Sequence, residues 1–211
     1  MNHQKPSFAE EKVLRSQGYS LIAGIDEVGR GALMGPVMAA AVILPEIFRA
    51  RWKSRVRDSK QLTPKEREYL YDLIRDIAVS VGIGSSSNDE IDSVGIAKAT
   101  RLAMIKAIAQ LEPQPQYLLI DYVKLKESSY PQKGITHGDC LCFSIACASI
   151  IAKVTRDRLV TEMDRDFPGY GFAGHKGYGT EKHIACLREK GPCRLHRRSF
   201  RPVSELTGWT P

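Results

Sequence analysis

The chain has 211 residues, which is enough for one large domain or one domain with a small appendage. It is 43% hydrophobic and 26% charged, with 17 Gly and 11 Pro, a composition typical of a folded protein that excludes a coiled coil, a collagen and a disordered chain. The 31 Lys and Arg against 24 Asp and Glu give a net charge of +7, which suggests a polyanionic partner without requiring one.

Three features predict a soluble protein of the cytoplasm. The longest apolar runs, such as residues 38–44, are far shorter than the ~20 residues that a membrane helix needs. The amino terminus, MNHQKPSFAEEK, is polar and has no hydrophobic signal region. The five cysteines form an odd set, and Cys140-x-Cys142 lacks the usual zinc spacing, so we expect reduced, packed thiols.

The first predicted elements are a short polar helix near residues 8–15 and two apolar strands over 21–26 and 36–44. About nine glycine-rich residues separate the two strands. That connection is too short for a crossover helix, so the strands should pair antiparallel.

The next segment begins with a helix start signal. Pro64 suits a first helical position, with Thr63 before it as a cap and Glu66 in the first turn. A third strand is predicted over 78–84, after this helix.

A second helix is predicted over 91–111, where Pro113 and Pro115 stop it. A short apolar strand over 117–120 ends at Asp121, and a long helical pattern runs over 142–163. The remainder is a basic tail rich in Gly, Pro, His and Arg. This order predicts an α/β sheet covered by helices.

Four acidic residues stand at the ends of these elements. Asp26 and Glu27 close the first strand, Asp121 closes the strand YLLID, and Asp139 precedes the long helix. Open α/β sheets bind ligands where adjacent strands end, and carboxylates held close together need a cation such as Mg²⁺ to compensate them. The pattern indicates a divalent-metal site. The alternative is that each acid marks a strand end at the surface, or in the case of Asp139 a helix cap.

The loop after the acid pair is rich in glycine. Gly29-Arg30-Gly31 would let a backbone approach a ligand closely, and Arg30 could face a phosphate or a sugar. A plain hairpin turn would explain the same glycines.

Five motifs, in order, resemble ribonuclease HII. They are GIDEVGRG at 24–31 running on to GPV at 35–37, DSKQLT at 58–63, ASIIAKVTRD at 148–157, HKGYGT at 175–180 and HRRSF at 196–200. The resemblance implies a ribonuclease H-like fold, with a mixed five-stranded sheet flanked by helices and a small helical C-terminal extension. It divides the chain into an N-terminal extension (1–19), a catalytic core (20–165) and a substrate-contacting extension (166–211).

The resemblance also implies roles for individual residues. Four would be catalytic carboxylates that bind two divalent ions, Mg²⁺ or Mn²⁺, and six would bind substrate. The carboxylates are Asp26, Glu27, Asp121 and Asp139. The loop Gly29, Arg30 and Gly31 would read the ribose 2′-hydroxyl, Tyr178 would pack on the neighbouring deoxyribose, and Ser59 and Lys60 would lie near the phosphate backbone. One departure concerns Tyr122, because the residue after the third carboxylate is commonly Gly in bacterial relatives.

The implied activity is an endonuclease that hydrolyses the RNA strand of RNA–DNA hybrids. It would also cut 5′ of single ribonucleotides in duplex DNA, in repair, leaving 5′-phosphate and 3′-hydroxyl ends. The partners would be these nucleic acids, with no membrane, and the chain would act as a monomer. Basic residues of 49–57 and 194–201 would add salt-sensitive affinity or form an ordinary solvated surface.

Ribonuclease HIII and a catalytically silent nucleic-acid-binding protein are the alternatives to this function. Ribonuclease HIII carries a substantial extra N-terminal domain, whereas 25 residues precede Asp26 here. A catalytically silent nucleic-acid-binding protein would be expected to lack a carboxylate, and all four are present. Some relatives bind a sliding clamp. Residues 206–209 of this chain carry no pattern that supports such a partner.

Overall fold

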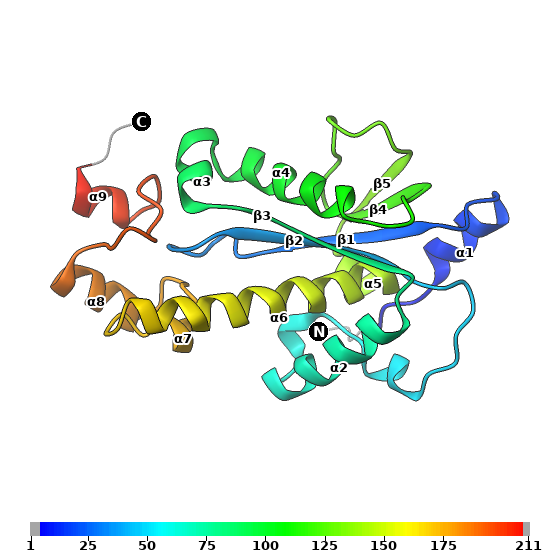
Figure 1. Ribbon diagram of the computed structural model, residues 1–211, viewed down its shortest axis with the longest axis horizontal. Coiled ribbons are helices and arrows are strands. Elements are labelled where there is room, and N and C mark those ends of the chain that lie inside the picture. The colour runs from blue at the N-terminus through cyan, green and yellow to red at the C-terminus, as the bar shows by residue number, and fades with distance from the viewer. Residues whose placement is uncertain (1–4, 209–211) are drawn as a thin grey trace.

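The computed structural model describes residues 5–208 and is built around one mixed five-stranded sheet between layers of helices (Figure 1). The strands are β1 (Ile22–Val28), β2 (Val37–Ile43), β3 (Ser80–Ser86), β4 (Tyr117–Asp121) and β5 (Gln132–Ile135), in the order β3-β2-β1-β4-β5. β1 pairs antiparallel with β2, as the short connection predicts, and parallel with β4. β3 extends the antiparallel side and β5 the parallel side.

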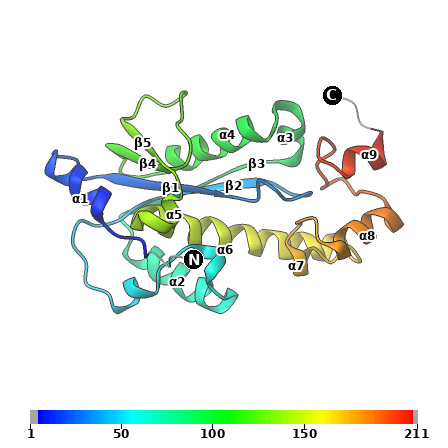
Figure 2. The same cartoon turned by 180° about the vertical axis from the view of Figure 1, so that it is seen from behind.

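Helices cover both faces of this sheet. The helices are α1 (Ala9–Ser16), α2 (Pro64–Ile77), α3 (Asn88–Val94), α4 (Ile96–Ala109), α5 (Gly138–Leu141), α6 (Phe143–Asp166), α7 (Phe172–His175), α8 (Glu181–Lys190) and α9 (Val203–Thr207), with 3₁₀ turns η1 (Arg51–Arg55) and η2 (Ser59–Gln61). Two opposite views show α4 on one face of the sheet and α6 with α2 on the other (Figures 1 and 2). No helix of residues 5–208 is long and apolar enough to cross a membrane.

Glycines in the strands allow these helices to lie directly on the sheet. A Cβ atom added to Gly24 of β1 would stand 2.2 Å from the backbone carbon of Ser144 in α6. On the opposite face, a Cβ on Gly82 or Gly84 of β3 would stand 2.0 Å from a backbone oxygen of α4. The sheet is therefore in backbone contact with a helix on each side, and Gly24 fixes the approach of α6 just before the acid pair.

Several predicted boundaries differ from the observed ones. The predicted helix over 91–111 is two helices, because Gly95 adopts φ +79° between α3 and α4. β3 begins two residues later than predicted, and α2 starts as predicted, with Thr63 and Glu66 forming a capping box. β5 was missed because its sequence, QKGI, is short and has only Ile135 buried.

Segments near both ends of the described range 5–208 pack on the core. Near the start, the buried carboxylate of Glu11 accepts a hydrogen bond from the backbone N–H of Ser144 (2.9 Å), in the first turn of α6. Near the end, the backbone N–H groups of Leu33 and Gly35 donate to Gly177 (2.8 Å) and Leu195 (2.9 Å), so the C-terminal segment holds the loop after β1. The tail considered for a clamp partner ends in Trp209, which lies outside the described residues.

Candidate functional site

Every residue that the sequence singles out for the site lines one cavity of about 510 Å³. The cavity lies where β1 and β4 end and where the η2 turn, α5 and α6 meet them. Its lining consists of Asp26, Glu27, Val28, Gly29, Arg30, Gly31, Ser59, Lys60, Asp121, Asp139, Ser149, Lys153 and Tyr178. The parallel pairing of β1 with β4 brings Asp26 and Asp121 to the same edge of the sheet.

Asp26 is the most enclosed of the carboxylates. It lies two residues after Gly24 in β1, so it points to the same side of the sheet, toward α6, and the N–H of Glu27 donates to it at 2.7 Å. Burial, followed by the negative charges of Glu27 and Asp121, raises the pKa of Asp26 well above its ordinary value. Burial also raises the pKa of Glu27. This part of the cavity therefore carries unfavourable negative charge that a bound cation would relieve.

Asp121 is fixed by the backbone despite the unusual residue that follows it. The N–H of Gly138 donates to its Oδ1 at 2.7 Å, and burial raises its pKa. Tyr122 adopts φ +61°, in the left-handed region that suits glycine, and its side chain is 67% exposed. The departure at Tyr122 thus strains the local backbone while Asp121 still lines the cavity.

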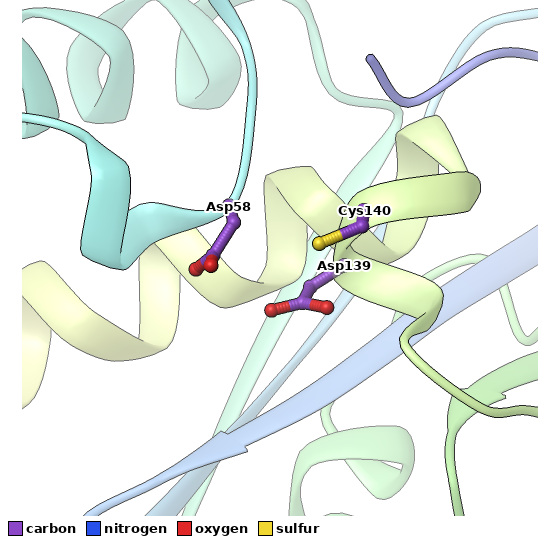
Figure 3. A group of neighbouring side chains, drawn as sticks. All are labelled: Asp58, Asp139 and Cys140. Carbon is purple, nitrogen blue, oxygen red and sulfur yellow. The ribbon is translucent and has the colours of Figure 1, made fainter. Parts of the chain in front are cut away.

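Asp139 lies on the single turn α5, and it has neighbours that the sequence did not indicate. The side chains of Asp58, Asp139 and Cys140 converge, with their donor atoms within 4.8 Å of one another (Figure 3). Asp58 lies next to Ser59 and caps η2 by accepting from the N–H of Lys60 at 2.9 Å. Oxygen donors predominate in this cluster, as hard divalent cations prefer.

Three polar groups at the α6 side complete the cavity. Ser149 and Ser59 form a buried hydrogen bond of 3.0 Å between their hydroxyl groups, linking η2 to α6. Lys153, one turn further along α6, pairs with Asp157 at 2.8 Å. Ser149 and Lys153 were missed as site residues, although their spacing of four within ASIIAKVTRD places both on one helix face.

Lys60 faces the carboxylates from η2. Burial disfavours its charged form, but the charges of Asp58, Asp139 and the acids behind them outweigh this effect and raise the pKa of Lys60. A positive charge therefore stands at the rim of an acidic cavity, suited to the phosphate of a nucleic acid.

The glycine loop, Gly29 to Gly31, also lines the cavity. Gly29 adopts φ +86°, and a Cβ there would stand 2.2 Å from Nε of the buried Arg156. The side chain of Arg30 reaches back to Glu27, with Nη1 3.4 Å from Oε1. Only glycine fits at position 29, so the backbone itself lines the cavity.

Tyr178 is held by a chain of buried histidines in the C-terminal segment. Nδ1–H of His183 donates to the carbonyl of Tyr178 at 3.0 Å, so Nε2 of His183 accepts from Nε2–H of His196 at 3.1 Å. Nδ1 of His196 in turn accepts from the N–H of Cys193 at 3.0 Å. This chain satisfies its donors and acceptors only when both imidazoles are neutral.

We expect this histidine pair to make stability depend on pH. Burial, with the neighbouring His183 and His175, lowers the pKa of His196 to about 4, and burial also lowers the pKa of His183. In the unfolded chain a histidine titrates near 6.5, so the unfolded state takes up protons first as pH falls. The contribution of this pair to stability should be complete above about pH 6.5 and fall by roughly 2–3 kcal/mol toward pH 4.

Urea unfolding between pH 7.5 and 4.5 measures this effect. His196→Gln cannot titrate at that position and should show a shallower dependence than the unaltered chain. Equal slopes for the two proteins would contradict the prediction.

The mixed five-stranded sheet, with acids at the ends of β1 and β4 and a long helix packed across it, is the ribonuclease H-like fold. The family model for ribonuclease HII matches residues 23–203. A ribonuclease HII from Dehalococcoides mccartyi is 57% identical over 201 residues, covering 95% of each chain. This chain belongs to the ribonuclease HII family.

Solved structures agree with this assignment. The ribonuclease H2 of Pyrococcus horikoshii OT3 superposes with a TM-score of 0.75 at 25% identity, covering 89% of this chain and 97% of that one. The RNase HII of Archaeoglobus fulgidus, solved in complex with PCNA, gives 0.73 at 26% identity, covering 86% and 95%. As a member of this family, the chain is an endoribonuclease, a hydrolase that acts on the RNA strand of RNA–DNA hybrids. The family is ribonuclease HII and not the alternative, ribonuclease HIII.

Proposed function

We propose that this enzyme cuts immediately 5′ of a single ribonucleotide embedded in duplex DNA, as well as within RNA–DNA hybrids, leaving 5′-phosphate and 3′-hydroxyl ends. The observation that carries the proposal is one cavity that is lined both by four carboxylates and by the backbone of the glycine loop. The carboxylates are the residue types for phosphodiester hydrolysis, and the loop is suited to recognising a ribose. All these residues come from one chain, which supports the proposal that the enzyme acts as a monomer.

The four carboxylates of the cavity are suited to binding divalent cations. Asp26, Glu27 and Asp121 share unfavourable charge, as their raised pKa values indicate, and Asp139 adds further oxygen atoms. Two ions of Mg²⁺ or Mn²⁺ held there would supply Lewis-acid activation of water and stabilisation of the leaving 3′-oxygen. The four carboxylates would hold the ions, while Lys60 and Ser59 would orient the phosphate backbone from the rim.

The glycine loop and Tyr178 would distinguish RNA from DNA. Because the 2′-hydroxyl alone differs between the two sugars, discrimination needs hydrogen-bonding groups at that position. Gly29, Arg30 and Gly31 present backbone to the cavity, and Tyr178 offers a flat ring for the adjoining deoxyribose. The ring of Tyr178 lies 5.7 Å from Nζ of Lys153, so it faces the same space as the basic groups.

Cleavage of a labelled DNA duplex that carries one ribonucleotide tests the proposal. We expect one cut 5′ of the ribonucleotide with Mg²⁺ or Mn²⁺, and no cut with a chelator. Cutting of long hybrids alone would retain the metal site but contradict the ribose-reading role of the glycine loop. Binding without any cutting would favour the catalytically silent protein.

Replacing Tyr178 with Ala should leave the fold intact and reduce the preference for a ribonucleotide junction. Loss of a stacking surface is worth about 1–3 kcal/mol, so kcat/KM on the single-ribonucleotide duplex should fall roughly 10- to 100-fold. Tyr178→Phe keeps the ring and should retain most activity. Unchanged cleavage by the alanine variant would reject the role of this ring.

A further inference from the structure

Arg197 of the motif HRRSF is a fully buried arginine behind the glycine loop. Its side chain donates to three backbone carbonyls of that loop. Nη2 donates to Gly29 at 2.7 Å, Nη1 to Arg30 at 2.9 Å, and Nε to Gly35 at 3.0 Å. The planar guanidinium thus fixes several peptide groups at once, which the single ammonium of a lysine could not do.

These bonds also determine where two N–H groups point. In a trans peptide the C=O and the following N–H are directed to opposite sides. Because Arg197 binds the carbonyls of Gly29 and Arg30, the N–H groups of Arg30 and Gly31 are turned away from it. Gly29, Arg30 and Gly31 line the cavity, and neither N–H has a protein acceptor within the described range 5–208.

The buried charge should also strengthen these donors. A hydrogen bond from an ionised group to a carbonyl polarises the peptide, and the N–H of that peptide becomes a stronger donor. Arg197 is itself held in place, since its N–H donates to Leu33 at 2.9 Å and its guanidinium lies 5.0 Å from the ring centre of Phe200. Arg197 therefore acts on the cavity through the loop, without lining the cavity itself.

We propose that Arg197 is a positioning residue for ribose recognition, which holds the N–H groups of Arg30 and Gly31 toward the cavity as a pair of donors for the 2′-hydroxyl oxygen. This inference rests on the proposed recognition of the 2′-hydroxyl and adds the residue that orients the two N–H donors. Substituting Arg197 should affect the choice between ribose and deoxyribose more than it affects binding to DNA as such.

Affinity for two labelled duplexes, identical except for ribose or deoxyribose at one position, tests the inference. The parent protein carries Asp26→Asn, so that the bound ribonucleotide stays intact in Mg²⁺. Arg197→Lys in that parent should reduce the ribose-to-deoxyribose affinity ratio roughly tenfold, as expected for loss of one to two hydrogen bonds, with little change for the all-DNA duplex.

Two controls separate orientation from stability and charge. Val203→Ala shortens a buried side chain in the same hydrophobic cluster as Leu33 and should destabilise the same segment without touching the carbonyls. Arg198→Lys changes the neighbouring, exposed arginine, which pairs with Asp92 instead. Both should keep the affinity ratio of the parent.

An unchanged ratio in Arg197→Lys, or an equal loss in Val203→Ala, would overturn the inference while leaving the proposed function standing. A parent with no preference for ribose would overturn both. In case Arg197→Lys does not fold, amide NMR of the parent gives an independent answer. The Arg30 and Gly31 resonances should shift with the ribonucleotide duplex beyond their shift with DNA, and identical shifts would refute the inference.

Discussion

Asp26→Asn should reduce cleavage in Mg²⁺ roughly a thousandfold while leaving the chain as stable as before or more so. Cleavage activity should fall because the carboxylate helps to hold a cation, and a bound cation stabilises the charge of the transition state by several kcal/mol. Stability should be kept or increased because burial and the charges of Glu27 and Asp121 disfavour the ionised Asp26, whose pKa is raised. A neutral amide of the same shape removes that unfavourable charge.

Steady-state cleavage of the single-ribonucleotide duplex, with thermal unfolding in a chelator, gives both readouts. Calorimetric titration with Mn²⁺ should show weaker binding by the variant. Asp89→Asn, an exposed carboxylate of α3, serves as the control and should change none of the three measurements. Near wild-type turnover in Asp26→Asn would remove Asp26 from the metal-binding set.

Gly24→Ala should destabilise the protein by about 3 kcal/mol or more, although it adds one methyl group. That methyl would stand 2.2–2.5 Å from backbone atoms of Ser144 and Ile145, which cannot move aside as a flexible side chain can. The helix α6 would have to separate from β1, and overpacking of this kind costs ~1–3 kcal/mol or more. Asp139 and Ser149 lie on the elements that would be displaced, so activity should fall as well.

A melting temperature lowered by roughly 6–12 °C would correspond to this loss in a domain of this size. Gly174→Ala is the matched control, because its Cβ would meet nothing within 4 Å and its φ is not positive. That variant should be as stable as the parent or slightly more stable. Equal melting temperatures for Gly24→Ala and the parent would mean that α6 can retreat from the sheet at little cost.

Local signals in the sequence were enough to locate most of the fold. The capping box at Thr63 and Glu66, the short connection between the first two strands, and the acid that ends YLLID each act over a few residues. The family motifs then supplied the number of strands in the mixed sheet and the roles expected of the site residues, but not the strand order. All ten predicted site residues line one cavity, while their individual roles stay predictions.

The features that escaped prediction depend on contacts between distant segments. β5 pairs with β4 through its backbone, so its residues need not be apolar. Asp58 approaches Asp139 only because η2 folds against α6, and Arg197 contacts the glycine loop although 167 positions separate it from Arg30 in the sequence. The split at Gly95 was overlooked because the apolar pattern continues through it, whereas the backbone conformation changes there.

The close contact between β1 and α6 also has a consequence for the order of folding. Chains emerge from the ribosome N-terminus first, so the residues of β1 and β2 are available well before those of α6. The helices α2 and α4, on opposite faces of the sheet, are also synthesised before α6, but the backbone that packs against Gly24 belongs to α6. We therefore expect the Gly24 face of β1 to be covered only once α6 is made, and the cavity, which Ser149 and Lys153 of α6 also line, to be completed after that.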